Sequence, residues 1–239
     1  MIYLAESEEI KEQVVGNVPF GKINSILEGK LERGDVERRN VVREVEEKNN
    51  QVITGGGKRF RVALPYIMAR GLELDHSDEE LVEAFIPIEM AHGLSLVMDD
   101  MIDEDKKRRG MKTPHERLKQ QGYTEKQAES LVTLDVMQIL SRAERAPFDL
   151  DFLQKQQQIE ITETIGESII RLTRGQELDV AGENSMQDEF QQKISYDGED
   201  FSYELFYRDV VEGKTSHLFE AGAKILETES GENLEELHE

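Results

Sequence analysis

The sequence contains no cysteine and no tryptophan, and only five of its 239 residues are proline. The absence of cysteine excludes disulfides, thiol catalysis and zinc sites built on cysteine. No uninterrupted run of about 18 apolar residues occurs, which argues against a transmembrane helix. The first residues lack the basic start and apolar stretch of a signal peptide, so we expect a cytoplasmic protein.

Basic residues are also scarce, because 29 Lys and Arg stand against 51 Asp and Glu and give a net charge of −22. Such a negative field repels nucleic acids and anionic membranes. We therefore expect no nucleic-acid binding and no stable membrane insertion. A dense carboxylate surface also suits a high-salt cytoplasm, but most of the acids are glutamate, and the sequence leaves open whether the source is halophilic.

The apolar pattern predicts a single all-α domain over residues 1–239. No proline follows Pro147, and no alternation of Val, Ile and Thr suggests strands. Residues 78–102 are apolar on most sides of a helix, which predicts a central buried helix. Further helices are predicted over residues 5–33, 60–71, 125–143, 150–181 and 202–228, with the longest loop over 185–200.

An aspartate-rich motif, Asp99-Asp100-Met101-Ile102-Asp103, ends the predicted central helix. Asp99 and Asp103 share one helix face because they are four residues apart, and Asp100 lies beside them. Carboxylates at a helix C-terminus favour a bound cation, since the helix dipole there disfavours negative charge. Mg²⁺ takes oxygen ligands and often joins one or two carboxylates to substrate phosphates. The motif therefore predicts a Mg²⁺-diphosphate site, and the competing interpretation is a solvated acidic face.

Two basic clusters accompany this motif. The first, GGGKRFR at 55–61, lies in residues 48–72, which hold five basic residues and no acid. Its cations gather where a helix begins, a place that favours anions. The second, Lys-Lys-Arg-Arg at 106–109, adds guanidinium groups that can bind phosphate in a bidentate manner. The competing interpretations are a helix start with a basic first turn and a surface salt-bridge network. His92, two turns before Asp99, is either a core histidine or a phosphate ligand.

Together these residues resemble the trans-isoprenyl diphosphate synthases. The matching segments are GGGKRFR at 55–61, HGLSLVMDDMIDEDKKRRGMKTPH at 92–115, GQELD at 175–179 and GKTSHLFEAGA at 213–223. The resemblance implies a single-domain helical bundle of the isoprenoid synthase type. It also implies a prenyltransferase that condenses isopentenyl diphosphate with an allylic prenyl diphosphate, with Mg²⁺ as cofactor and geranylgeranyl diphosphate as the expected product.

The resemblance further implies roles for individual residues. Mg²⁺-assisted ionisation of the allylic diphosphate falls to Asp99, Asp100 and Asp103, with Asp99 and Asp103 as direct metal ligands. The isopentenyl diphosphate site corresponds to Lys58, Arg61, His92 and Arg109. The allylic diphosphate side corresponds to Arg108, Gln176, Thr215 and the catalytic Lys214, with Asp179 as an acid near that site. The pocket that limits product length corresponds to Ala91, Leu94 and Ser95.

The sequence departs from the family pattern after Thr215. The family carries a second aspartate-rich motif beyond the GKT segment, whereas residues 216–239 contain no DDxxD. This departure leaves a second interpretation, a weakly active or non-catalytic partner subunit that regulates a full-length synthase. We expect a homodimer or a heterodimer with a related synthase. Two further interpretations stay open: a terpene cyclase, which needs no isopentenyl diphosphate site, and a plain helical interaction protein.

Overall fold

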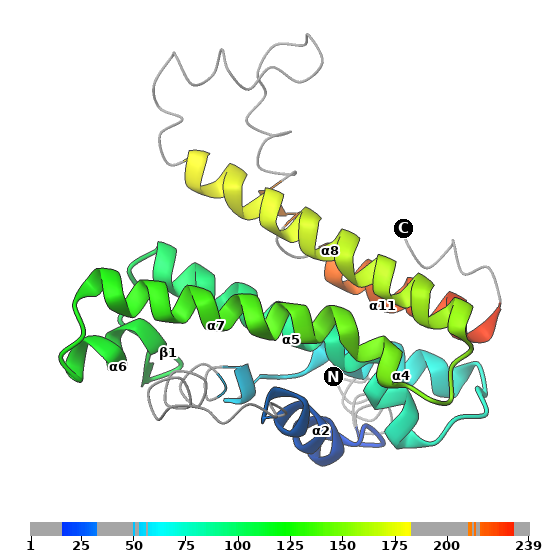
Figure 1. The fold of residues 1–239 in the computed structure, drawn as a ribbon. Coiled ribbons are helices and arrows are strands. Elements are labelled where there is room, and N and C mark those ends of the chain that lie inside the picture. Colours follow the sequence, from blue (N-terminus) through cyan, green and yellow to red (C-terminus); the bar gives the residue numbers. More distant parts are fainter. Residues whose placement is uncertain are drawn as a thin grey trace, which may run out of the picture.

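The computed structural model describes residues 16–32, 50, 53–55, 57–182, 210–211, 213 and 216–231. Within these ranges the regular secondary structure is helical apart from one short β-hairpin, which confirms the all-α class (Figure 1). The elements in order are α2 (Phe20–Glu32), α4 (Phe60–Gly71), α5 (Asp78–Ile102), β1 (Lys107–Arg108), β2 (Met111–Lys112), α6 (Pro114–Gln120), α7 (Glu125–Arg145), the 3₁₀ turn η1 (Ala146–Asp149), α8 (Lys155–Gly182) and α11 (His217–Ser230).

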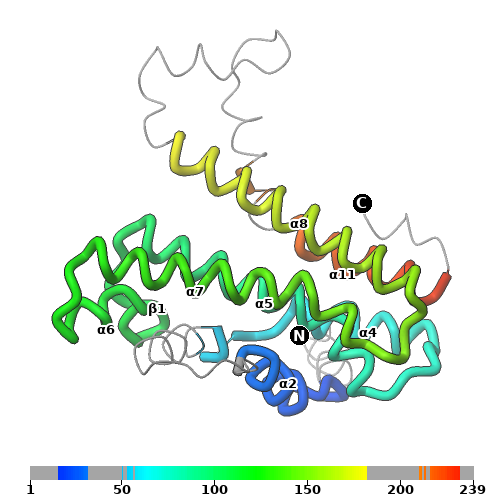
Figure 2. The backbone as a smooth tube through the Cα atoms, viewed as in Figure 1, coloured from blue at the N-terminus to red at the C-terminus, as the bar shows by residue number. Residues whose placement is uncertain are grey.

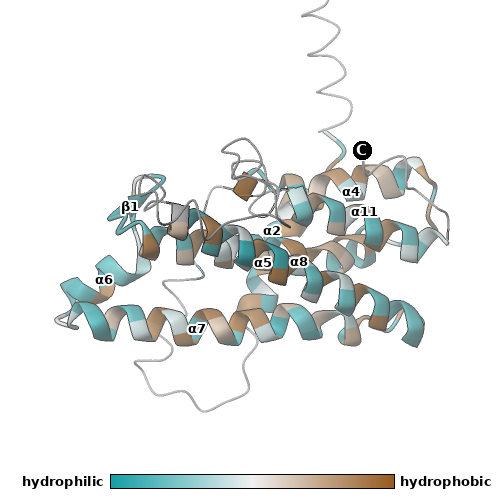
Figure 3. Ribbon diagram, turned by 90° about the horizontal axis from the view of Figure 1, so that it is seen from above, coloured by the Kyte–Doolittle hydropathy of each residue, from teal (hydrophilic) through white to brown (hydrophobic). Residues whose placement is uncertain are grey.

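Helix α5 is the core of the fold. A reciprocal capping box between Ser77 and Glu80 starts it, and this arrangement satisfies two backbone N–H groups at the helix end. Helices α2, α4, α7 and α11 all pack against it, so its apolar ribbon lies in the middle of the molecule (Figure 3). By length and composition α5 would be long enough to cross a membrane, but 72% of its most apolar stretch is buried inside the protein. Its hydrophobicity is therefore accounted for by core packing.

Helices α7 and α8 extend along the same side of α5. Helix α7 begins with a second capping box, formed by Thr124 and Gln127, and buries Val132, Val136 and Ile139. The backbone trace shows α8 approaching α7 near the end of α7 and diverging from it toward the C-terminal end of α8 (Figure 2). Both helices also contact α5.

The predicted helices over 60–71 and 78–102 match α4 and α5. The helix predicted over 5–33 is wrong at residues 16–19, which form a turn, because Pro19 cannot continue a helix. The helix predicted from residue 150 starts only at Lys155, after η1 and a further turn. Residues 1–15, 185–200 and 202–209, on which other predictions fall, lie outside the described residues.

Helix α6 and the hairpin were not predicted from the sequence. Helix α6 has only seven residues, and each strand has two, so neither is long enough to show a periodic apolar pattern. The hairpin turns at Arg109 and Gly110, whose φ angles of 50° and 79° match the type I′ turn that suits a two-residue connection.

A buried carboxyl group lies at the C-terminal end of α11. The side chain of Glu229 is fully buried, and neither of its oxygen atoms has a hydrogen-bond partner. The Nε2 atom of His76 lies 3.8 Å from its Oε2 atom. Burial raises the pKa of Glu229 to about 8, and the negative charge of Glu80 contributes to the rise. The folded protein therefore favours the protonated acid.

We predict that replacing Glu229 with Gln reduces the loss of stability at alkaline pH. The pKa of Glu229 in the folded protein lies above its ordinary value of 4.5. The stabilisation that the protonated acid provides is therefore complete below pH 4.5 and is lost as pH rises through about 8. At about 1.4 kcal/mol per pKa unit, the wild type should lose about 3 kcal/mol of unfolding free energy between pH 6 and pH 9 through this group. Thermal unfolding at both pH values measures the difference. The exposed Glu163→Gln serves as control, and equal losses in Glu229→Gln and wild type would contradict the prediction.

Candidate active site

The aspartate-rich motif occupies the end of α5, and Asp103 is its C-terminal cap. The hairpin folds back over this end and brings Arg108 to the motif. Its Nε atom donates a hydrogen bond of 2.5 Å to Oδ1 of Asp100, and its Nη2 atom lies 3.4 Å from Oδ2 of Asp99. Asp100 is fully buried, and this burial raises its pKa while the bond from Arg108 opposes the rise. Carboxylates and guanidinium therefore meet at one point, as the sequence predicted.

The donor set at this point suits Mg²⁺ shared with a ligand. The Oδ2 atom of Asp100 is buried without a hydrogen-bond partner. Among the described residues, no three acidic or histidine side chains are close enough to hold a metal by themselves. Mg²⁺ usually takes one or two protein carboxylates and completes its shell with water and phosphate oxygens. Asp99 and Asp103 are thus compatible with a metal that binds together with a diphosphate.

A basic cavity of about 290 Å³ lies on one face of α5, the face that carries Glu89, His92, Gly93 and Leu96. It brings together all four residues predicted for isopentenyl diphosphate. Its basic and titratable lining residues are Lys58, Arg59, Arg61, Glu89, His92 and Arg109. Four of these side chains are cationic and one is a carboxylate, so the cavity suits an anion even though the chain as a whole is strongly acidic.

Two buried nitrogen atoms of this cavity have no hydrogen-bond partner in the protein. The Nε atom of Arg61 and the Nδ1 atom of His92 are buried without hydrogen bonds. The Arg61 guanidinium carbon lies over the Phe219 ring, 4.9 Å from its centre, which is a favourable cation–π distance. Burial lowers the pKa of His92 to about 3, and the positive charges of Arg61 and Arg109 contribute to the drop. His92 is therefore neutral at ordinary pH and has a buried nitrogen available for a ligand.

Two arginine side chains hold the basic cavity together. Arg109 has a left-handed φ of 50°, and its Nη1 atom donates a 2.6 Å hydrogen bond to the carbonyl of Gly55. The hairpin turn is thereby tied to the glycine-rich segment, defined here as residues 53–55 and 57–61. Arg59 in this segment is 4% exposed and forms a 2.8 Å ion pair with Glu89. Sequence reasoning counted Arg59 among the basic residues but gave it no role.

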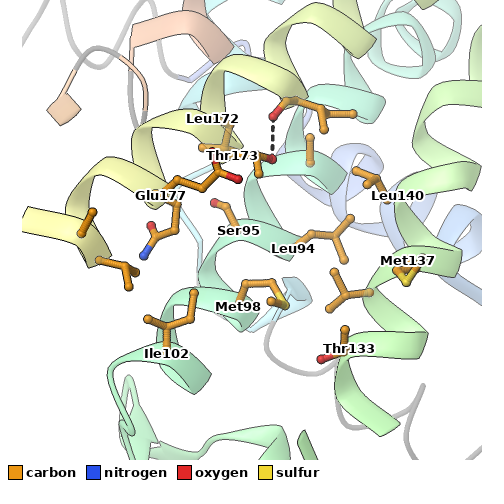
Figure 4. A pocket seen from close by; sticks show the side chains of 16 residues that line it. Leu94, Ser95, Met98, Ile102, Thr133, Met137, Leu140, Leu172, Thr173 and Glu177 are labelled. Carbon is orange, nitrogen blue, oxygen red and sulfur yellow. Dashed lines mark hydrogen bonds between the residues drawn. The ribbon is translucent and has the colours of Figure 1, made fainter. Parts of the chain in front are cut away.

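An apolar cavity of about 590 Å³ lies on the other face of α5, between α5, α7 and α8 (Figure 4). The predicted chain-length residues Ala91, Leu94 and Ser95 line it, and none of the lining residues that the structure describes is aromatic. Its remaining walls carry Met98 and Ile102 from α5, Thr133, Val136, Met137 and Leu140 from α7, and Ile169, Leu172, Thr173, Gln176, Glu177, Val180 and Ala181 from α8.

The remaining predicted residues concern the allylic diphosphate. Gln176 lines the apolar cavity, and its Nε2 atom is buried without a hydrogen-bond partner. Lys214 and Thr215 lie outside the described residues, but the preceding Gly213 is described. A Cβ atom at Gly213 would lie 2.7 Å from the Cα atom of Gly175, so the GKT and GQELD segments meet backbone to backbone.

We predict that the His92 imidazole does not titrate between pH 5 and pH 8. Its pKa of about 3 lies below the ordinary 6.5, so the ring stays neutral in the folded protein throughout this range. Because the unfolded state still binds a proton, this group destabilises the fold as pH falls below 6.5. Nitrogen NMR of the imidazole rings tests this, with His92→Gln identifying the signal. A titration midpoint near the ordinary value would contradict the prediction.

Comparison with known proteins identifies a matching family. The family described as "Polyprenyl synthetase" matches residues 42–239. The chain is 27% identical over 182 residues to a geranylgeranyl diphosphate synthase of Methanosarcina mazei (76% of this chain, 48% of that one) and 28% identical over 210 residues to one of Sulfolobus acidocaldarius (87% and 54%). The chain thus spans about half the length of these curated relatives.

The fold is also shared with solved structures. The geranylgeranyl pyrophosphate synthetase of Pyrococcus horikoshii aligns with a TM-score of 0.68 at 23% identity, covering 95% of this chain and 59% of that one. This likeness confirms the helical bundle, and the family match extends over most of the sequence. The chain belongs to the polyprenyl synthetase family.

Proposed function

We propose that this chain is a cytoplasmic trans-prenyltransferase that condenses isopentenyl diphosphate with an allylic prenyl diphosphate, with geranylgeranyl diphosphate as the product. The observation that carries the proposal is the pair of unlike cavities on α5, which ends in the aspartates. The basic cavity is small and suits a short diphosphate, whereas the apolar cavity is twice as large and suits a long hydrocarbon chain. Two such cavities match two substrates. The names of the matched relatives support the same reaction.

Each group has a separate task in this reaction. Asp99 and Asp103 would hold Mg²⁺, which supplies charge that stabilises the departing diphosphate. Arg108, hydrogen-bonded to Asp100, presents its guanidinium on the same side. Lys58, Arg61, Arg109 and the neutral His92 hold the isopentenyl diphosphate. The apolar walls around Ser95 exclude water, which would otherwise quench the allylic cation.

A second candidate function, that of a partner subunit, is favoured by the outer face of α7. Leu134 is 58% exposed there, which is unusual for a large apolar side chain on a surface rich in acids. A second copy of the chain or a related synthase would cover this face. We propose a homodimer or a heterodimer, and co-purification with a full-length synthase that raises its activity would favour the regulatory interpretation.

We predict that Asp99→Ala and Asp103→Ala each reduce kcat by about 100-fold or more, because each removes a carboxylate that would bind the metal. Circular dichroism should show an intact fold, since both side chains lie at the end of α5 and outside the apolar core. Mg²⁺-dependent prenyl transfer measures the effect, with the exposed Asp151→Ala as control. Near-normal turnover of either variant at low Mg²⁺ would refute the metal assignment.

We predict that Ser95→Phe and Leu94→Phe shorten the product toward farnesyl diphosphate. Along the cavity, Ala91 and Ile102 are separated by eleven helical steps of α5, about 16 Å. If each isoprene unit spans about 5 Å, the cavity holds about three to four units. A phenylalanine ring at position 94 or 95 lies partway along the cavity and shortens the space left for the product. The surrounding side chains are packed and can make room for the ring only with strain. Product chromatography measures the lengths, and Leu134→Phe on the exposed face of α7 is the control. Unchanged lengths in both variants would place the limiting wall elsewhere.

A further inference from the structure

The Arg59 side chain connects three parts of the chain. Its Nη1 atom donates to Glu89 Oε1 on α5 at 2.8 Å and to the carbonyl of Ile53 at 2.9 Å. Its Nη2 atom donates to the carbonyl of Thr54 at 2.6 Å, and its Nε atom donates to Asn24 Oδ1 on α2 at 2.9 Å. One guanidinium thus fixes the start of the glycine-rich segment to both α5 and α2.

The backbone of Arg59 is fixed as well. Its φ of 54° is left-handed, a conformation that is unfavourable for a residue with a side chain. Its carbonyl accepts hydrogen bonds from the N–H groups of Val62 and Ala63 and so starts α4. Because Lys58 precedes this residue and Arg61 follows it by two, the conformation of Arg59 determines where both cations point.

Two glycines make room for this arrangement. A Cβ atom at Gly57 would lie 2.5 Å from Nη1 of Arg59, and a Cβ atom at Gly93 would lie 2.5 Å from Cγ2 of Ile53. Gly93 follows His92 directly and is one helical turn beyond Glu89. The glycine-rich segment is therefore seated on the part of α5 that carries His92, with an apolar contact at Gly93 and an ion pair at Glu89.

We propose that Arg59 and Glu89 are positioning residues that clamp the glycine-rich segment to α5 and so align Lys58 and Arg61 with His92 and Arg109 for isopentenyl diphosphate. This inference rests on the proposed function. Glu89 has a second effect, because its negative charge opposes the lowering of the Arg61 pKa by burial and thus helps Arg61 remain charged. The clamp serves the basic cavity alone, since neither residue lines the apolar cavity.

We expect the protein to stay folded when both Arg59 and Glu89 are replaced. Replacing a buried ion pair with apolar residues of similar volume is often neutral for stability, whereas removing one partner is strongly destabilising. The double variant Arg59→Met/Glu89→Met should therefore stay folded but lose the bonds to the Ile53 and Thr54 carbonyls. Arg59→Lys keeps the charge but lacks the planar fork that reaches both carbonyls. The matched control is Arg70→Met/Asp78→Met, an exposed ion pair that also joins α4 to α5.

The experiment measures two affinities by titration calorimetry. Isopentenyl diphosphate without Mg²⁺ reports on the basic cavity, and inorganic pyrophosphate with Mg²⁺ reports on the aspartate end. In the double variant and in Arg59→Lys, the Kd for isopentenyl diphosphate should rise about tenfold or more, because small misplacements of binding groups are costly. The Kd for Mg²⁺-pyrophosphate and the thermal midpoint of the double variant should stay near wild type, and the control should change neither affinity.

Other outcomes overturn the inference. Equal weakening of both ligands in the double variant would indicate general structural damage, and an unchanged Kd for isopentenyl diphosphate would show that the clamp does not position the cavity. Full recovery in Arg59→Lys would show that charge alone suffices. A wild-type chain that binds isopentenyl diphosphate but forms no product would refute the proposed function and leave this inference standing.

Discussion

Burial of most of α5 governs how the rest of the molecule is arranged. A mostly buried helix offers its polar groups little access to water, so each polar side chain in its buried part needs a specific partner or a ligand. Glu89 has Arg59, Asp100 has Arg108, and His92 avoids the cost by staying neutral. The ion pairs of Glu89 and Asp100 thus attach the glycine-rich segment and the hairpin to α5. The basic cavity and the apolar cavity lie on two different faces of the same helix.

The sequence predicted α4 and α5 well because their signals are local and strong. Residues 78–102 combine a capping box with dense apolar side chains, and both operate within a few residues of one another. Pro19 and the turn before Lys155 were missed because the apolar pattern continues through them. The hairpin is too short for any pattern, and its type I′ turn has Arg109 where asparagine or glycine is more usual.

The candidate site was predicted from composition more than from geometry. The acid-free window singled out the segment that carries Lys58 and Arg61, and the structure brings both to one cavity with His92 and Arg109. It did not distinguish Arg59 from its neighbours, because the left-handed φ at this residue turns its side chain inward against the periodicity of the following helix. Which of several adjacent arginines is buried depends on distant partners such as Glu89 and Asn24, and no local pattern encodes them.

The contact between Gly213 and Gly175 constrains how this protein can evolve. The atoms that an added methyl group would meet are Cα and N of Gly175 and the carbonyl oxygen of Arg171, all of them main-chain atoms. A clash with a side chain can be relieved by a second substitution, but main-chain atoms are the same whatever residue stands there. Position 213 is therefore closed to alanine in any sequence background that keeps α8 in place, and a lineage can escape only by moving the helix.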